Sequence, residues 1–191
     1  FQRYKLKNYS TIFPVGTGTG NFHNINYEIN LGRNSINQPI YPRSGSDISL
    51  GLELTPPYSL LSNKDYSTLD ENEKYKWIEY HKWKAKAYWY FELMDKLVLA
   101  SKIRFGYLGH YNSVIGTTPF ERFYLGGDGL SGYNNFDGRE IIGMRGYANE
   151  TVTPLYYKDK NIGGTIFTRY SLELRYPISL NPSSTIYAQA F

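Results

Sequence analysis

Residues that could act as catalysts or metal ligands are widely separated in this chain of 191 residues. The chain has no cysteine, which excludes disulfides, zinc–thiolate sites and thiol catalysis. Its histidines, His23, His81 and His110, lack the HExxH spacing and the paired carboxylates of metal or hydrolytic sites. No Ser, His and Asp arrangement indicates an activated nucleophile. The sequence therefore predicts a protein that is not an enzyme and that uses neither a metal nor another cofactor.

Two further polar motifs are predicted to be surface loops. The run from Gly16 to Gly20 has the glycine content of a phosphate-binding loop, but it lacks the required spacing and a following helix. The charged run from Asp70 to Lys74 is predicted to be a solvated loop with a short helical turn. The net charge of +4 is mild and its basic residues are scattered, so no nucleic-acid partner is expected.

Apolar and polar residues alternate with a period of two along much of the chain, which predicts strands. Between 165 and 178, Leu172 and Leu174 share one face, while Arg169 and Glu173 share the other. Similar alternation predicts about seven strands, at 2–10, 24–31, 47–54, 82–93, 97–107, 165–178 and 184–191. Plentiful Tyr, Phe, Gly and Asn also favour strands and turns over helices.

The lengths of the strands and of their connections point to a membrane. Many segments reach about ten residues, which is enough for a tilted strand to cross a bilayer. Short connections at 38–45, 94–96 and 179–183 alternate with long ones at 11–20, 55–81 and 109–164, as in outer-membrane barrels. The predicted fold is therefore an all-β, antiparallel transmembrane β-barrel segment. A soluble sandwich or lipocalin-like barrel is the alternative, since it also alternates polar and apolar residues.

The longest connection, 109–164, carries two motifs. Phe120, Phe123, Gly126 and Gly127 form an F-x-x-F-x-x-G-G pattern, and the segment Met144–Tyr147 reads M-R-G-Y. This pair resembles the approach and the [VI]-R-G-[FY] tip of the long loop in the outer-membrane assembly-factor superfamily, which includes BamA and two-partner-secretion transporters. Met144 replaces the usual Val or Ile. The turn from Tyr41 to Ser46 also resembles the family's F/Y-P-x-x-G-S turn. The amino-acid sequences of these segments resemble those of the BamA proteins of Bacteroidota.

The resemblance implies a role for the loop tip. In relatives the loop folds back into the barrel, and the arginine of its tip pairs with a carboxylate on the inner wall. Arg145 is thus expected to pair with Glu173, because a guanidinium fork matches a carboxylate. Gly146 would let the backbone pass close to the wall, and Tyr147 would pack as an anchor. The alternative is that Arg145 is an ordinary exposed residue in a turn.

The resemblance also implies a function and a location. It predicts that residues 1–191 are part of one C-terminal outer-membrane β-barrel domain, covering the middle and later strands of a sixteen-stranded barrel. POTRA domains and the remaining strands would lie outside this chain. The implied function is an insertase that folds β-barrel proteins into the outer membrane. Its expected partners are unfolded outer-membrane clients, accessory lipoproteins or surface proteins, and lipid. A related translocation or secretion pore is the alternative.

Overall fold

The structure is a computed structural model, and it describes residues 1–8, 18–128, 138–153 and 162–191. Parts of the predicted first strand and of the glycine-rich run lie outside these residues. The chain divides into two compact units. We call Phe1–Glu28, Glu53–Lys82 and Gly106–Phe167 the loop unit, and Ile29–Leu52, Trp83–Phe105 and Thr168–Phe191 the strand unit.

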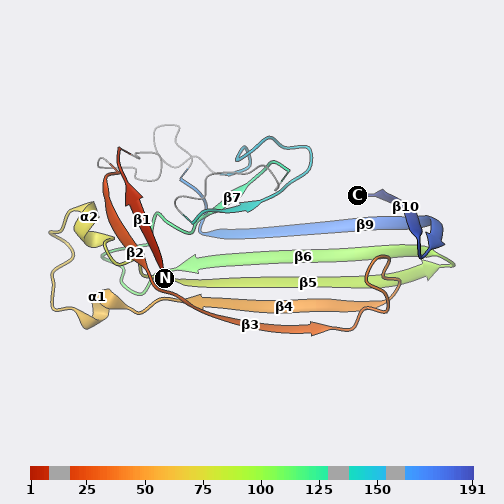
Figure 1. Ribbon diagram of the computed structural model, residues 1–191, viewed down its shortest axis with the longest axis horizontal. Coiled ribbons are helices and arrows are strands. Elements are labelled where there is room, and N and C mark those ends of the chain that lie inside the picture. The colour runs from red at the N-terminus through yellow and green to blue at the C-terminus, as the bar shows by residue number, and fades with distance from the viewer. Residues whose placement is uncertain (9–17, 129–137, 154–161) are drawn as a thin grey trace. The chain divides into compact units, whose positions relative to one another are not determined.

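Six strands form one sheet in the order β10, β9, β6, β5, β4, β3 (Figure 1). Their bounds are Tyr27–Asn34 for β3, Gly45–Leu54 for β4, His81–Met94 for β5, Leu97–Gly109 for β6, Ile166–Asn181 for β9 and Ser184–Ala190 for β10. The longest three, β5, β6 and β9, have 14, 13 and 16 residues, so each can cross a bilayer at a tilt. The sheet confirms the six predicted strands that follow residue 20.

The faces of β9 are distinguished by exposure. Leu172 and Leu174 are 47% and 41% exposed, whereas Arg175 is 7% exposed and Glu173 is partly buried. The exposed row also contains Ile166, Tyr170, Tyr176, Ile178 and Leu180. This is the reverse of a soluble strand, which buries its apolar row and exposes its charges. An apolar surface of this kind marks contact with another apolar phase.

The turn between β3 and β4 is tied down by its own residues. The backbone N–H groups of Arg43 and Ser44 donate to Asn37 Oδ1 at 2.9 and 3.3 Å. Gly45 has φ +101°, and a Cβ there would lie 2.2 Å from the Ser35 carbonyl oxygen, so only glycine fits. Tyr41 is 2% exposed, and its hydroxyl anchors the turn by donating to the carbonyl oxygens of Lys96 and Arg175 at 3.1 and 3.0 Å. The predicted turn motif thus has a structural role.

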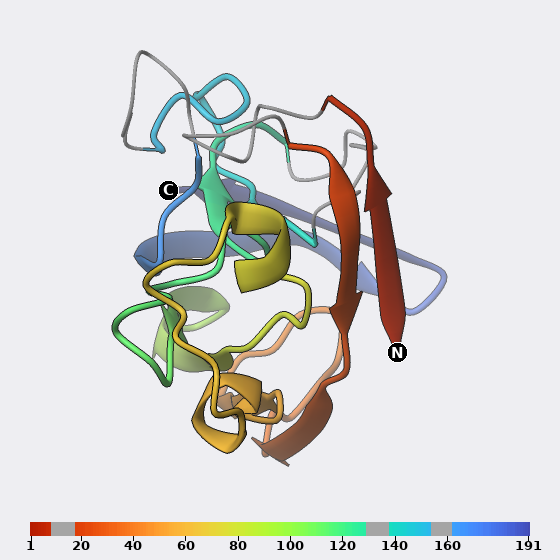
Figure 2. The same cartoon turned by 90° about the vertical axis from the view of Figure 1, so that its left-hand side faces the viewer.

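The loop unit contains short strands that the alternation of apolar and polar residues did not predict. β1 (Gln2–Leu6) pairs with β2 (Gly20–Asn24) in a sheet of their own, as Figure 2 shows. β7 (Phe123–Leu125) pairs in parallel with β8 (Glu140–Ile142) inside the long connection. The described residues therefore contain ten strands, because short pairs formed by distant segments add three to the predicted seven.

The loop unit also contains two single-turn helices, α1 (Tyr58–Leu61) and α2 (Glu71–Lys74). The Asp70 carboxylate caps α2 by accepting from the Glu73 N–H at 2.9 Å, which confirms the predicted helical turn. Among the described residues, no helix is long and apolar enough to span a membrane.

Candidate functional site in the long connection

The motif phenylalanines form the core of the loop unit. Phe120 and Phe123 are fully buried. The Phe120 ring lies 5.1 Å from the ring of Tyr4, and the Phe123 ring lies 4.8 Å from that of Phe167. Gly106 on β6 makes this packing possible, because a Cβ there would be 2.3 Å from the Phe167 ring. The motif therefore anchors the start of the long connection against the strand β6 and the hairpin β1–β2.

The motif glycines are required by both space and conformation. Gly126 and Gly127 have φ values of +129° and +77°. A Cβ at Gly127 would lie 1.7 Å from Asn149 Oδ1, and one at Gly126 would lie 2.3 Å from the Ala148 carbonyl oxygen. The Gly127 carbonyl also accepts from the Met144 N–H at 2.8 Å. The glycine pair thus holds the segment that carries the loop tip.

The loop tip is a tight turn. The Tyr147 N–H donates to the Met144 carbonyl at 3.2 Å, and Gly146 has φ +85°. Arg145 is exposed, and Tyr147 is 55% exposed. Within the loop unit, a Cβ at Gly146 would meet no described atom within 4 Å, so the positive φ of the turn is what this unit requires of the glycine. The expected contacts of Gly146 and Tyr147 with a barrel wall stay predictions, because the wall strands belong to the strand unit.

The two kinds of glycine predict different responses to substitution. Gly126→Ala is expected to destabilise the loop more than Gly146→Ala does. Both add the strain of an alanine at positive φ, about 1–2 kcal/mol, but only Gly126→Ala also drives a Cβ into backbone, 2.3 Å from the Ala148 carbonyl oxygen. Limited proteolysis of the intact protein in detergent micelles measures the difference as faster cleavage between 110 and 165. Equal cleavage rates in the two variants would contradict the packing shown by the structure.

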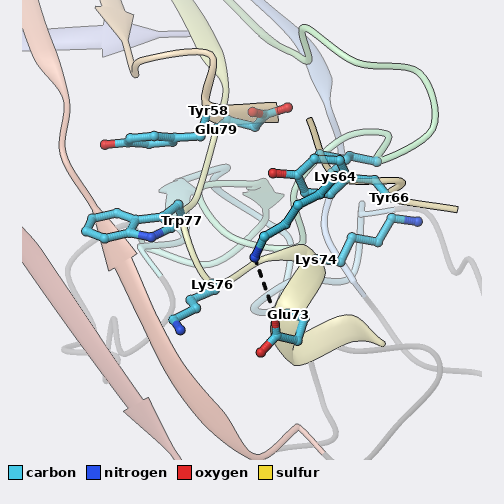
Figure 3. Close-up of a pocket in the computed structure, with 9 residues that line it drawn as sticks. Tyr58, Lys64, Tyr66, Glu73, Lys74, Lys76, Trp77 and Glu79 are labelled. Carbon is cyan, nitrogen blue, oxygen red and sulfur yellow. Dashed lines mark ion pairs between the residues drawn. The ribbon is translucent and has the colours of Figure 1, made fainter. Parts of the chain in front are cut away.

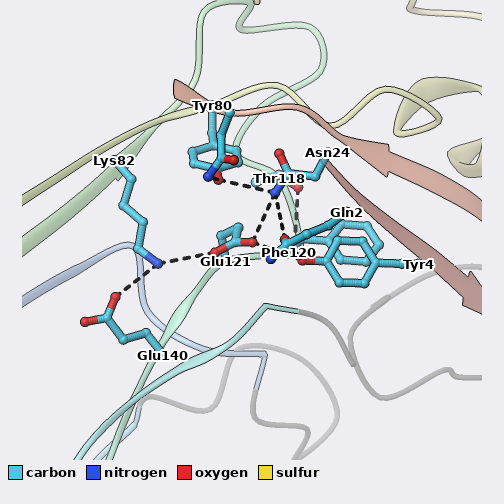
Figure 4. Close-up of polar contacts among 10 residues, drawn as sticks. Gln2, Tyr4, Asn24, Tyr80, Lys82, Thr118, Phe120, Glu121 and Glu140 are labelled. Carbon is cyan, nitrogen blue, oxygen red and sulfur yellow. Dashed lines mark hydrogen bonds and ion pairs between the residues drawn. The ribbon is translucent and has the colours of Figure 1, made fainter. Parts of the chain in front are cut away.

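A buried charge cluster lies beside the motif (Figure 4). Lys82, the second residue of β5, places its Nζ 3.5 Å from Glu121 Oε2 and 3.1 Å from Glu140 Oε2. Its side chain is only 3% exposed, and those of Glu121 and Glu140 are 10% and 24% exposed. The Lys82 ammonium also lies 5.0 Å from the centre of the Phe123 ring. One lysine therefore ties the beginning of β5 to two separate parts of the long connection.

Glu121 is the centre of this cluster. Its Oε1 accepts from the Tyr4 hydroxyl and from Asn24 Nδ2, both at 3.2 Å, so it also holds the β1–β2 hairpin. Asn24 Nδ2 lies 3.3 Å from the Tyr80 hydroxyl as well. Glu121 has φ +62°, a conformation that side chains with a Cβ rarely adopt. The strained backbone places the carboxylate where four segments of the chain meet.

Stability is expected to depend on pH through Glu121. Burial raises the pKa of the Glu121 carboxyl above its ordinary value, although Lys82 opposes this effect. Because the folded pKa exceeds the unfolded one, the stabilisation is complete below pH 4.5, the ordinary value, and is lost as the pH rises through the folded pKa. As the pH rises, the free energy of unfolding measured with urea should therefore fall for the wild type relative to that of Glu121→Gln. A pH-independent difference would exclude this linkage.

Sequence reasoning missed most of this cluster. Glu121 stands between the two motif phenylalanines, and Lys82 begins the predicted strand 82–93, but neither was predicted to be buried. The signal that could have found Glu121 is a lone carboxylate within an apolar motif. Glu140 carries no such signal, because it comes to Lys82 only through the parallel pairing of β7 and β8.

The predicted wall carboxylate, Glu173, has two cationic partners in the strand unit. Its Oε1 accepts from Lys102 Nζ at 2.5 Å, and its Oε2 accepts from Arg175 Nη2 at 2.6 Å. Its side chain is 14% exposed, in agreement with its place on the polar face of β9. Arg145 belongs to the loop unit and Glu173 to the strand unit, so their pairing stays a prediction.

A separate cavity of about 90 Å³ lies in the connection between β4 and β5 (Figure 3). Trp77, Tyr66 and Lys64 are among the side chains that line it, and Lys64 pairs with Glu73 at 3.9 Å. Glu79, also in the lining, accepts from both the N–H and the hydroxyl of Ser59 at 2.8 and 2.6 Å. The two glutamates in this lining, Glu73 and Glu79, are therefore already engaged in an ion pair and in hydrogen bonds, respectively. Across the described ranges, no group of three or more His, Asp or Glu residues could hold a metal ion.

Comparison with known proteins gives a family and a fold. The chain matches the Omp85 superfamily domain over residues 1–191. It is similar to the crystal structure of BamA from Haemophilus ducreyi lacking POTRA domains 1–3, with a TM-score of 0.53 and 21% sequence identity. The match covers 82% of this chain and 26% of that chain, so the chain spans about a quarter of that structure. No curated protein matches it.

Proposed function

The chain belongs to the Omp85 superfamily, and from that premise we propose that it is the barrel portion of an insertase that folds β-barrel proteins into the outer membrane. The chain is part of an outer-membrane β-barrel protein, and the superfamily comprises membrane assembly and transport proteins that are not enzymes. Its proposed partners are unfolded outer-membrane polypeptides, accessory lipoproteins or surface proteins, and the lipid of the bilayer.

The exposed apolar row of the sheet is the observation that carries this proposal. Large apolar side chains on one face, alternating with partly buried charged ones on the other, suit strands between lipid and water. A client strand that enters lipid alone leaves its backbone groups unpaired at several kcal/mol each. An insertase lowers this barrier without covalent chemistry, because a strand edge can serve as a template and the local bilayer can be thinned.

The experiment uses the intact protein reconstituted in liposomes. A small outer-membrane barrel, unfolded in urea, is added, and its folding is followed by heat-modifiable mobility on SDS gels. The protein is expected to accelerate folding relative to liposomes that lack it. An unchanged rate of client folding, together with a conductance in planar bilayers, would overturn the proposed insertase function. It would favour the related translocation or secretion pore.

We propose in addition that the loop tip acts through Arg145 and that the pairing of Arg145 with Glu173 stabilises the working barrel. The motif that supports this proposal has its phenylalanines buried and its glycines in constrained positions, so the connection is a built structure. Glu173 already accepts from Lys102 and Arg175, so Arg145 would take the place of one of them.

Arg145→Ala is expected to slow client folding by about fivefold, which corresponds to about 1 kcal/mol for a partly solvated pair. The same liposome assay measures it, with Lys7→Ala as a control at an exposed lysine of the loop unit. The charge-swapped double variant Arg145→Glu with Glu173→Arg should recover part of the loss. Wild-type activity of Arg145→Ala would remove this mechanism and leave Arg145 as an exposed turn residue.

A further inference from the structure

The polar face of the strand unit carries more positive than negative charge. The alternation along β4, β5, β6 and β9 assigns six basic residues and three carboxylates, one of them Glu92, to this face. The basic residues are Lys84, Lys86, Lys102, Arg104, Arg169 and Arg175, and the other two carboxylates are Asp47 and Glu173. Near the turn, Glu92 is paired with Arg43 and adds no net charge. The face therefore has a clear excess of positive charge.

Several of these cations are held in place by their surroundings. The Lys86 and Lys102 ammonium groups lie 5.2 and 5.7 Å from the centre of the Tyr88 ring. The Arg175 guanidinium lies 5.6 Å from that of Tyr90, and its side chain is only 8% exposed. Partly buried charges are weakly screened by salt, so the excess acts at closer to its full strength than it would on an open surface. The face is pre-organised for an anion.

Three of these cations, Lys102, Arg104 and Arg169, line a hollow on the polar face. A cavity of about 110 Å³ has side chains of β5, β6 and β9 around it, namely Tyr88, Lys102, Arg104, Arg169, Ser171 and Glu173. The three cations in this lining come from β6, which carries Lys102 and Arg104, and from the neighbouring strand β9, which carries Arg169. Positions two residues apart on a strand are about 7 Å apart and neighbouring strands about 4.8 Å apart, so the three cations match a partner with several carboxylates in a row.

We propose that this basic face binds an acidic, extended polypeptide segment whose carboxylates pair with Lys102, Arg104 and Arg169. The inference rests on the proposed function in one respect, that the face lines the interior of a barrel. Arginine suits the role because its planar fork binds a carboxylate through two hydrogen bonds. Anionic lipid is not favoured, because the apolar side chains that would meet lipid belong to the opposite face of the sheet.

The test measures binding of a fluorescent oligoglutamate peptide to the intact protein in detergent micelles by anisotropy. An oligolysine peptide of equal length tests the sign of the charge. Lys102→Gln with Arg104→Gln and Arg169→Gln is expected to weaken oligoglutamate binding by about tenfold. The control, Arg3→Gln with Lys5→Gln and Lys7→Gln, removes the same charge from exposed positions of the loop unit and should leave the affinity within about twofold.

Each other outcome overturns the inference. Equal losses in both triple variants would show attraction by net charge alone, and equal binding of oligolysine would exclude recognition of acid. Displacement of the peptide by millimolar inorganic phosphate would indicate a small-anion site instead.

Two further measurements keep the test decisive. A variant with Lys102→Arg, Arg104→Lys and Arg169→Lys keeps the charge and should still bind, which guards against misfolding of the glutamine variant. Client folding measured on the same preparations separates the two proposals: activity without peptide binding refutes only this inference, and binding without activity refutes only the insertase.

Discussion

Replacing Lys82 with alanine is expected to lower the free energy of unfolding of the intact protein by about 3–5 kcal/mol. The variant leaves the Glu121 carboxylate buried next to Glu140 without the cation that lies 3.5 and 3.1 Å from them. A buried ion whose partner is removed keeps its full desolvation cost, and the two carboxylates then repel each other. Thermal unfolding in detergent micelles, followed by the loss of heat-modifiable mobility, measures the effect.

The matched control for this prediction is Lys86→Ala, four residues further along β5. Lys86 pairs with Asp47 at 2.9 Å, but its side chain is 36% exposed, so water can replace the partner and the cost should stay below about 1 kcal/mol. The double variant Lys82→Met with Glu121→Gln should recover most of the lost stability, because it removes the two most buried charges and leaves only Glu140, whose side chain is 24% exposed. Equal losses for Lys82→Ala and Lys86→Ala would show that burial at Lys82 has no energetic consequence.

Placing an arginine at Leu50 is expected to cost about 2–4 kcal/mol of stability in a lipid bilayer. Leu50 is in the middle of β4 and is 41% exposed on the apolar face. A guanidinium at that position must enter hydrocarbon or distort the bilayer around it. The measurement is unfolding of the intact protein in lipid vesicles by urea, read from the heat-modifiable fraction.

The neighbouring position supplies the control. Ser49→Arg introduces the same charge one residue earlier, on the polar face that also carries Asp47, and should change stability by less than about 1 kcal/mol. The large difference between adjacent residues is what a sheet with lipid on one side requires. If Ser49→Arg costs as much as Leu50→Arg, or more, then the apolar face of β4 does not contact lipid, and the soluble-barrel alternative gains support.

The motif in the long connection can be recognised in the sequence because its signals are local. Phe120, Phe123, Gly126 and Gly127 form a short pattern whose members are buried or conformationally constrained in the structure. The function of the loop tip is harder to predict from the sequence. Hydrogen bonding within the segment makes a tight turn, whereas the expected contact of Gly146 and Tyr147 with a wall stays a prediction. A motif states which residues recur, but it does not state what surrounds them.

The long strands and the character of their faces could be predicted from the sequence alone. Alternation is a property of strand geometry, since successive side chains point to opposite sides, and it needs no knowledge of distant segments. The three-dimensional structure was needed to show that β1 and β2 form a sheet of their own, that β7 and β8 pair in parallel, and that Lys82, Glu121 and Glu140 are buried together. Lys82 and Glu121 are 39 residues apart, and Glu121 and Tyr4 are 117 apart. Contacts between residues so far apart in the sequence depend on the fold of the whole chain. The local alternation of apolar and polar residues does not encode that fold.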